Sequence, residues 1–310
     1  MSGSEEPEND ATEEMGSDPL LASEREASEG QGSDPMRLGG MALRNGLLVH
    51  GPTHWAVAVR NSADEIEVAS GLKPTLARGR LATTPLIRGP LKLAEALAVV
   101  PLARMRLRSA RLPFEDPRVI AAAAMASAGS AAARKLAKGN ASREALVALL
   151  GLAPALAALR DPDLAAYHGA EHKAIGAYES GGSAADEPKE HERCGSNLIG
   201  PMLAFSVAGQ VLVEGTLERP NAIARGAASL AAAGAAVEVF AFSERKPDAA
   251  LSRAVHGAGH EIQRLVSTRE PTADQLAVGE AAVRELLRVE PSPADRASGG
   301  SAGVDPTPPT

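Results

Sequence analysis

The chain has 310 residues and a formal net charge of −7. Residues 1–35 contain eleven acidic residues against one basic residue, Arg25, whereas residues 36–290 carry a net charge of +4. The composition therefore excludes a strongly acidic globule and an extended basic surface for nucleic acid. The single cysteine, Cys194, excludes an intrachain disulfide framework, and the many alanines favour helices.

The two ends of the chain differ in composition from the part between them. Residues 1–35 are rich in Glu, Ser, Gly, Asp and Pro, and we predict a disordered acidic tail there. Residues 291–310 are rich in Pro, Gly, Ser and Ala, and we predict a second disordered tail. The folded part is expected to extend over residues 36–290.

Residues 36–112 are predicted to form a small N-terminal α/β region. Residues 55–60 and 65–69 alternate apolar with polar or small side chains on either side of a polar segment, which predicts a β-hairpin. The Arg88-Gly89-Pro90 sequence is typical of a turn, and a helix is expected after it, at residues 91–99.

Residues 113–245 are predicted to be helical and to span a membrane. They contain four apolar stretches of 15–18 residues, and a membrane-spanning helix needs about 17–25 residues. The stretches are residues 119–133, 145–159, 197–213 and 226–243. Hydropathy alone leaves open a second interpretation, in which two buried helical hairpins form a soluble all-α domain.

The charges that flank the apolar stretches give a mixed indication of topology. Four arginines at positions 104, 106, 108 and 111 precede the first stretch and favour the cytoplasm for that side. Four crossings would then leave both termini in the cytoplasm and residues 134–144 outside. That outer loop carries four basic residues, against the usual tendency, so either the first hairpin does not cross or this loop is an exception.

Residues 246–290 are predicted to form a C-terminal helical region. Residues 272–289 carry apolar side chains at helical spacing, and Thr272 with Gln275 forms a capping-box pattern directly after Pro271. We expect this amphipathic helix to pack against the rest of the protein.

A cluster of titratable residues between positions 167 and 194 indicates a metal site. His168 and His172 are four residues apart, so on a helix they share one face. His191 and Cys194 follow after a Gly-Gly sequence that is expected to end the helix. Histidine and cysteine are typical ligands of zinc. The sequence therefore predicts a divalent transition metal, zinc above all, bound by His168 and His172, with His191 and Cys194 as further ligands or as groups that orient the first two.

Three other residues of the cluster have predicted roles beside the metal. Glu171 completes the order His-x-x-Glu-His, in which the carboxylate acts as general base on the metal's water. Lys173 and Glu179 are predicted to contact and orient the metal ligands without binding the metal themselves. The spacing alone does not distinguish a catalytic site from a structural site closed by four protein ligands.

The motifs resemble those of a known family. The sequence from Tyr167 to Lys173 (YHGAEHK), the Ala177-Tyr-Glu179 sequence and residues 191–196 (HERCGS) are similar to the signature of the YqhQ-like bacterial proteins. Residues 55–60, residues 85–89, and Gln263 with residues 267–271 agree with this resemblance, which extends over residues 36–290. Asn45 and His50 depart from the family's pattern.

The resemblance implies a multi-pass protein of the bacterial inner (cytoplasmic) membrane and a predicted metal-dependent enzyme. The residue patterns themselves predict a mainly α fold, with a small strand-containing N-terminal region and disordered termini, and the flanking arginines favour termini in the cytoplasm. The expected partners are membrane lipid and other membrane proteins, with no nucleic acid. It implies no particular substrate.

Three functional hypotheses follow. The first is a hydrolase-type enzyme that uses metal-activated water at the boundary of membrane and cytoplasm, with Glu171 as base. The second is a non-catalytic membrane scaffold or biogenesis factor, in which the His/Glu/Cys cluster is a structural metal site or a hydrogen-bonded network. The third is a metallopeptidase similar to the inverted zincins, which depends on residues 168–172 alone.

Overall fold

A four-stranded antiparallel sheet forms the N-terminal part of the computed structural model, which describes residues 35–136 and 141–291. Its strands lie in chain order: β1 (Gly39–Leu43), β2 (Gly46–His50), β3 (His54–Arg60) and β4 (Ile66–Leu72). The predicted hairpin is confirmed, because β3 pairs with β4 from His54 opposite Leu72 to Arg60 opposite Ile66. The rest of the described chain is mainly helical, as predicted.

The first hairpin of the sheet, β1 with β2, has no alternating pattern in the sequence. Its central residues Leu47, Leu48 and Val49 are all buried, since both faces of β2 are covered. A strand that is buried on both faces shows a continuous apolar run, and periodicity does not distinguish such a short run from other structure. This explains why only the second hairpin was predicted.

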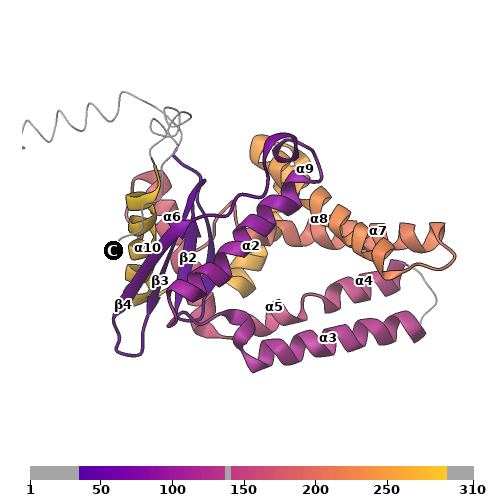
Figure 1. The fold of residues 1–310 in the computed structure, drawn as a ribbon, viewed down its shortest axis with the longest axis horizontal. Coiled ribbons are helices and arrows are strands. Elements are labelled where there is room, and N and C mark those ends of the chain that lie inside the picture. Colours follow the sequence, from indigo (N-terminus) through magenta and orange to yellow (C-terminus); the bar gives the residue numbers. More distant parts are fainter. Residues whose placement is uncertain (1–34, 137–140, 292–310) are drawn as a thin grey trace, which may run out of the picture. The chain divides into compact units, whose positions relative to one another are not determined.

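Two helices cover the two faces of the sheet (Figure 1). Helix α2 (Arg88–Arg106) packs Val99, Val100 and Ala103 against the face that carries Trp55 and Val57. Helix α10 (Ala273–Val289) contacts β2, β3 and β4, and its apolar side chains are buried there. The predicted capping box of α10 is present, with Thr272 accepting a hydrogen bond from the Gln275 N–H.

Helix α2 is longer than the sequence indicated. It was expected at residues 91–99, after a turn, but it already begins at Arg88. Gly89 and Pro90 therefore lie in its first turn, where proline is tolerated because the N–H that it lacks would have no partner within the helix. Arg88 pairs with Glu238, with 2.8 Å between Nε and Oε1.

Two helical hairpins extend away from the sheet (Figure 1). In the first, α3 (Pro117–Leu136) packs against α4 (Ala141–Leu150) and α5 (Ala153–Ala158). In the second, α7 (Ile199–Thr216) packs against α8 (Ala222–Arg245), and α4 contacts α7 between the hairpins. The four predicted apolar stretches lie in these helices.

Three helical segments are long and apolar enough to span a membrane: Ala141–Ala158, Gly195–Thr216 and Ala222–Arg245. In their most apolar windows only 11%, 6% and 22% of the residues, respectively, are buried inside the protein. Their apolar side chains thus face outward, which disagrees with buried hairpins of a soluble domain and indicates a membrane protein. Helix α3 does not reach the same apolarity, because most of its apolar residues are alanines.

The remaining helices position the titratable cluster. Helix α6 (Pro162–Ser180) begins after Asp161, which caps it, and ends at Gly181 in the left-handed conformation, as the Gly-Gly sequence predicted. It packs against β1 and α10. Helix α9 (Ala250–Ile262) and a π-helical turn, η4 (Gln263–Ser267), then lead back toward α6.

The described residues from Arg37 onward belong to one compact unit. The predicted disordered tails, 1–35 and 291–310, lie outside the described residues except for residues 35 and 291. The boundaries predicted between residues 112 and 113 and between residues 245 and 246 stay predictions.

Candidate metal centre

His168 and His172 lie one turn apart on the buried face of α6, and each is oriented by a main-chain carbonyl group. His168 Nδ1–H donates to the Ser267 carbonyl oxygen at 2.8 Å, and His172 Nδ1–H donates to the Lys189 carbonyl oxygen at 2.6 Å. A carbonyl oxygen only accepts, so each ring carries a proton on Nδ1 and leaves Nε2 for another partner. A hydrogen bond from the ring nitrogen that does not bind the metal is typical of histidines that ligate a metal.

Cys194 completes a group of three potential ligands. Its Sγ lies 3.5 Å from His168 Nε2, and one ligand atom from each of His168, His172 and Cys194 lies within 4.8 Å of the other two. His172 and Cys194 are buried. Zinc holds histidine nitrogen at about 2.0–2.1 Å and cysteine sulfur at about 2.3 Å. Small inward movements of these side chains would therefore enclose one ion, and the residues present fit such a metal.

One side of this group faces a cavity of about 470 Å³, which we call the metal cleft. The cleft lies between β1, α5, α6 and the segment 191–196. Three protein ligands with an open fourth direction are typical of a catalytic zinc site, whereas a structural site is closed by four protein ligands.

Glu171 lines the metal cleft beside the three potential ligands. Its carboxylate accepts no hydrogen bond from any residue that the structure describes, and its side chain is buried. Burial raises the pKa of Glu171 to about 7, although the neighbouring His168 lowers it. Gly40 of β1 lies against this carboxyl group, since a β-carbon built at position 40 would be only 2.6 Å from the carboxyl carbon of Glu171. A larger residue at position 40 would therefore displace the Glu171 carboxyl group.

His191 lies next to the ligand group without belonging to it. Its ring centroid is 5.7 Å from that of His172. Its Nε2–H donates to Glu179 at 3.2 Å, and its Nδ1 accepts a hydrogen bond from the Arg193 N–H at 3.3 Å. Both ring nitrogens therefore have protein partners, and the predicted ligand role of His191 stays a prediction.

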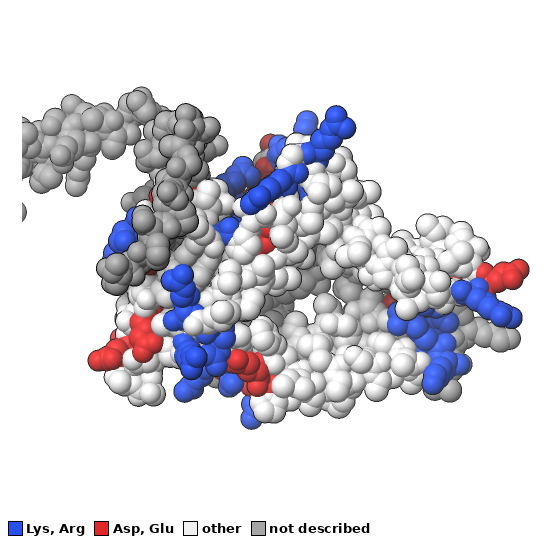
Figure 2. All heavy atoms as spheres, viewed as in Figure 1, with Lys and Arg blue, Asp and Glu red and all other residues white. Residues whose placement is uncertain are grey.

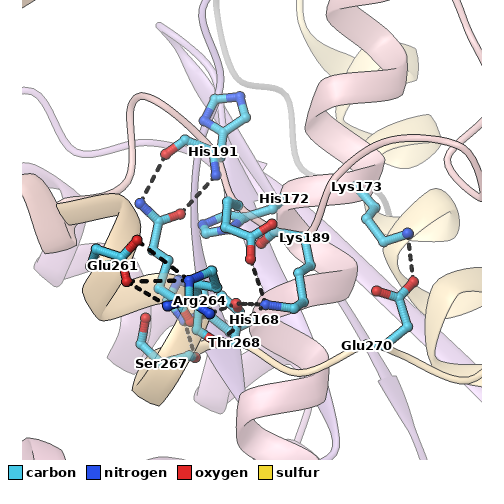
Figure 3. Close-up of polar contacts among 12 residues, drawn as sticks. His168, His172, Lys173, Lys189, His191, Glu261, Arg264, Ser267, Thr268 and Glu270 are labelled. Carbon is cyan, nitrogen blue, oxygen red and sulfur yellow. Dashed lines mark hydrogen bonds and ion pairs between the residues drawn. The ribbon is translucent and has the colours of Figure 1, made fainter. Parts of the chain in front are cut away.

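Glu179 and Lys173, which were predicted to orient the metal ligands, have different partners in the structure. Glu179 binds His191 and forms an ion pair with Arg193, so it holds the segment that carries Cys194. Lys173 points away from the histidines, and its Nζ donates to Glu270 at 2.6 Å (Figure 3). That ion pair ties α6 to the segment between η4 and α10.

Burial also shifts the pKa values of the histidines and the cysteine. Desolvation lowers the pKa of His172 well below its ordinary value and lowers that of His191. Desolvation raises the pKa of the Cys194 thiol. The imidazoles of His172 and His191 are therefore neutral near pH 7, and the neutral imidazole is the form that binds a metal.

Three residues that fix this site were not predicted to belong to it. Gln263 is almost fully buried; its Oε1 accepts from the His191 N–H at 2.7 Å, and its Nε2 donates to the His191 carbonyl oxygen at 3.1 Å (Figure 3). Ser267 and Lys189 contribute only carbonyl oxygens. Gln263 and Ser267 do stand in the C-terminal block that carries the family resemblance. A single sequence reveals no spacing that links this block to His168.

A second pair of histidines lies outside the metal cleft. His256 and His260 of α9 line a separate cavity with Glu192 and Gln263. His256 lies 3.8 Å from Glu244. Among the described residues, this pair is not part of any group of three or more metal-binding side chains.

A comparison with known families covers this region. Residues 117–289, from the start of α3 to the end of α10, match the model of a family described as "Protein of unknown function (DUF1385)". The chain belongs to this family. All residues of the candidate centre of this DUF1385 protein lie in the matched region, whereas the sheet precedes it. No curated protein and no solved structure matches the chain.

Proposed function

We propose that this DUF1385 protein is a metal-dependent hydrolase whose active site is the metal cleft. The observation that carries the proposal is the convergence of His168, His172 and Cys194 on one point that is open to the cleft. The carbonyl anchors of both histidines and the buried carboxyl of Glu171 beside them support the same conclusion.

The chemistry follows from the positions of these side chains. A zinc ion held by His168, His172 and Cys194 would supply Lewis acidity and would lower the pKa of a water molecule. Glu171 would accept a proton from a water molecule in the metal cleft, and the oxygen of that water would bond to the carbonyl carbon of an ester or amide. The bond to the leaving group would then break, and Glu171 would give the proton to that group.

A site on the cytoplasmic side of a bacterial inner membrane is part of the proposal. Helix α6 contacts β1 and α10, so the segments before, between and after the two hairpins pack together. Each hairpin must therefore begin and end at these packed segments, which we call the body of the protein. Helix α3 forms the first hairpin together with the more apolar helices α4 and α5. The arginines at 104, 106, 108 and 111, close to the start of α3, favour the cytoplasm for this body.

Metal content tests the proposal directly. Purified wild-type protein should contain about one zinc ion per chain, and the His168→Ala, His172→Ala double variant should contain none, because two of three ligands are gone. The matched control is His256→Ala with His260→Ala, which should keep its metal. Elemental mass spectrometry of folded, detergent-purified proteins measures all three. Undiminished metal in the first double variant would overturn the site.

The role of His191 separates a three-ligand centre from a four-ligand one. His191→Phe should keep about one metal ion per chain, since neither ring nitrogen of His191 is directed at the ion in this arrangement. Cys194→Ser should lose most of it. A loss of metal in His191→Phe as complete as in the double histidine variant would instead establish a closed, structural site.

A further inference from the structure

A second cavity of about 470 Å³ lies between the two helical hairpins, and we call it the membrane cavity. Its walls come mainly from α4 and residues 151–152 on one side and from residues 195–210 and α8 on the other, within the segments that are apolar enough to span a membrane. Figure 2 shows this face of the hairpins almost free of charged side chains, with Lys and Arg gathered near their tips. The cavity thus lies at the depth where lipid chains are found.

The lining of the membrane cavity suits an apolar occupant. Leu198, Met202, Val147 and Ala233 contribute to it. Several polar groups among its residues already have partners: Gln210 Nε2 donates to the Arg225 carbonyl oxygen at 3.1 Å, and Glu144 is paired with arginines. Arg134 Nε, at one end of the cavity, has no partner among the described residues. Because a polar ligand would find these groups engaged, an alkyl chain is the better fit.

Gly195 lines both the membrane cavity and the metal cleft and directly follows Cys194. We call this shared part of their walls the junction. A β-carbon built at this position meets no atom within 4 Å, so the space beside it is open. Residues of the helical segment 151–158 also line the two cavities, Leu152 the membrane cavity and Ala155 the metal cleft.

We propose that the substrate is a membrane amphiphile with a long alkyl chain, and this inference rests on the proposed hydrolase function. The alkyl chain lies in the membrane cavity and passes Gly195, so that the polar end with the scissile bond reaches Glu171 in the metal cleft. The membrane supplies such a molecule directly between the hairpins, without transfer through water.

The variant that tests this inference is Gly195→Leu, which adds a side chain at the junction, where a β-carbon meets no atom within 4 Å. The matched control is Gly200→Leu on α7. A β-carbon there also meets no atom within 4 Å, but Gly200 lines a different groove between α4 and α7. Ala233→Phe, which fills the membrane cavity from α8, is a second variant that leaves the junction untouched. Metal content measured in each variant reports whether the centre is intact.

Binding is measured first, with palmitic acid that carries a photoreactive diazirine in mid-chain, added to the full-length protein in phosphatidylcholine nanodiscs. Labelling of the membrane cavity, mapped by mass spectrometry at Leu198 and Met202, should fall about ten-fold in Gly195→Leu and in Ala233→Phe. Gly200→Leu should label as the wild type does. Equal labelling in all four proteins would overturn the inference.

Hydrolysis is measured second, with p-nitrophenyl palmitate and p-nitrophenyl acetate. The ratio of the palmitate rate to the acetate rate should fall about ten-fold in Gly195→Leu. An unchanged ratio would count against the inference even if both esters are cleaved. Failure of the hydrolase proposal looks different: neither ester is cleaved, whereas the labelling and its sensitivity to Gly195→Leu persist.

Discussion

Glu171→Gln should leave the metal content at the wild-type value and reduce hydrolysis about 10²–10⁴-fold, the usual contribution of a general base. Glutamine has the shape of glutamate but accepts no proton from water at neutral pH. Because the wild-type carboxylate accepts no hydrogen bond from the described residues, the substitution breaks no hydrogen bond, and glutamine keeps the packing against Gly40. The loss should therefore appear in the rate and not in stability. Initial rates with p-nitrophenyl acetate, beside elemental analysis, measure it.

The matched control for this substitution is Glu280→Gln on the exposed side of α10, which should behave as the wild type. Wild-type activity in a metal-loaded Glu171→Gln protein would remove the general base from the proposal. A scaffold with a structural centre should show no functional loss in this variant. The experiment therefore distinguishes the enzyme from the scaffold.

Glu144→Ala should destabilise the protein by about 3 kcal/mol, because it removes the acidic partner of two arginines at the tip of the hairpins. The Glu144 side chain is 1% exposed, and its oxygens lie 2.9 Å from Arg143 and 3.2 Å from Arg134. Arg143 also pairs with Glu214, which binds Arg225 at 3.0 Å. Without Glu144, Arg134 loses its carboxylate partner, Arg143 and Arg225 both bind Glu214, and the like charges repel one another.

Thermal unfolding in detergent, followed by circular dichroism, measures this effect, and Glu144→Ala should unfold several degrees below the wild type, as a loss of about 3 kcal/mol implies. Glu218→Ala is the matched control, since this glutamate is exposed at the same tip. An unfolding temperature for Glu144→Ala equal to that of Glu218→Ala would show that the ion pairs at the tip contribute nothing to stability.

The same ion pairs bear on the charge distribution that the sequence left in conflict. Arg134 and Arg143 oppose the usual tendency if the tip of the first hairpin is outside the cytoplasm. Both are paired with glutamates in the structure, one of which, Glu214, comes from the second hairpin. The count of basic residues in a loop does not include such partners, so the sequence overstates the positive charge that faces the outer side.

Local patterns predicted the elements that depend on local interactions. The hairpin of β3 and β4, the cap of α10 and the end of α6 at Gly181 each follow from a few neighbouring residues, and each is confirmed. Strand β2 was not predicted, because its burial on both faces is created by α2 and α10, which lie far from it in the chain. The start of α2 at Arg88 depends on the tolerance of its first turn for proline.

In the candidate site, too, the features that depend on neighbouring residues were predicted, and those that depend on distant segments were not. The spacing of His168, Glu171 and His172 on one helix brings these side chains to one face, as predicted. The arrangement of residues 191–194 was not evident from spacing, since Gln263 fixes the backbone of His191 from a distance of 72 residues. The contacts of the His191 ring with Glu179 and Arg193 likewise depend on the path of a loop.

The carbonyl anchor of His168 has a consequence for the biosynthesis of the protein. Ser267 follows His168 by 99 residues, and both helices of the second hairpin, α7 and α8, lie between them. During translation the chain folds from its N-terminus onward. The carbonyl group that orients His168 is therefore synthesised only after both helices of the second hairpin. A metal bound at this centre as proposed would thus find His168 in its final orientation only once the chain is complete through Ser267.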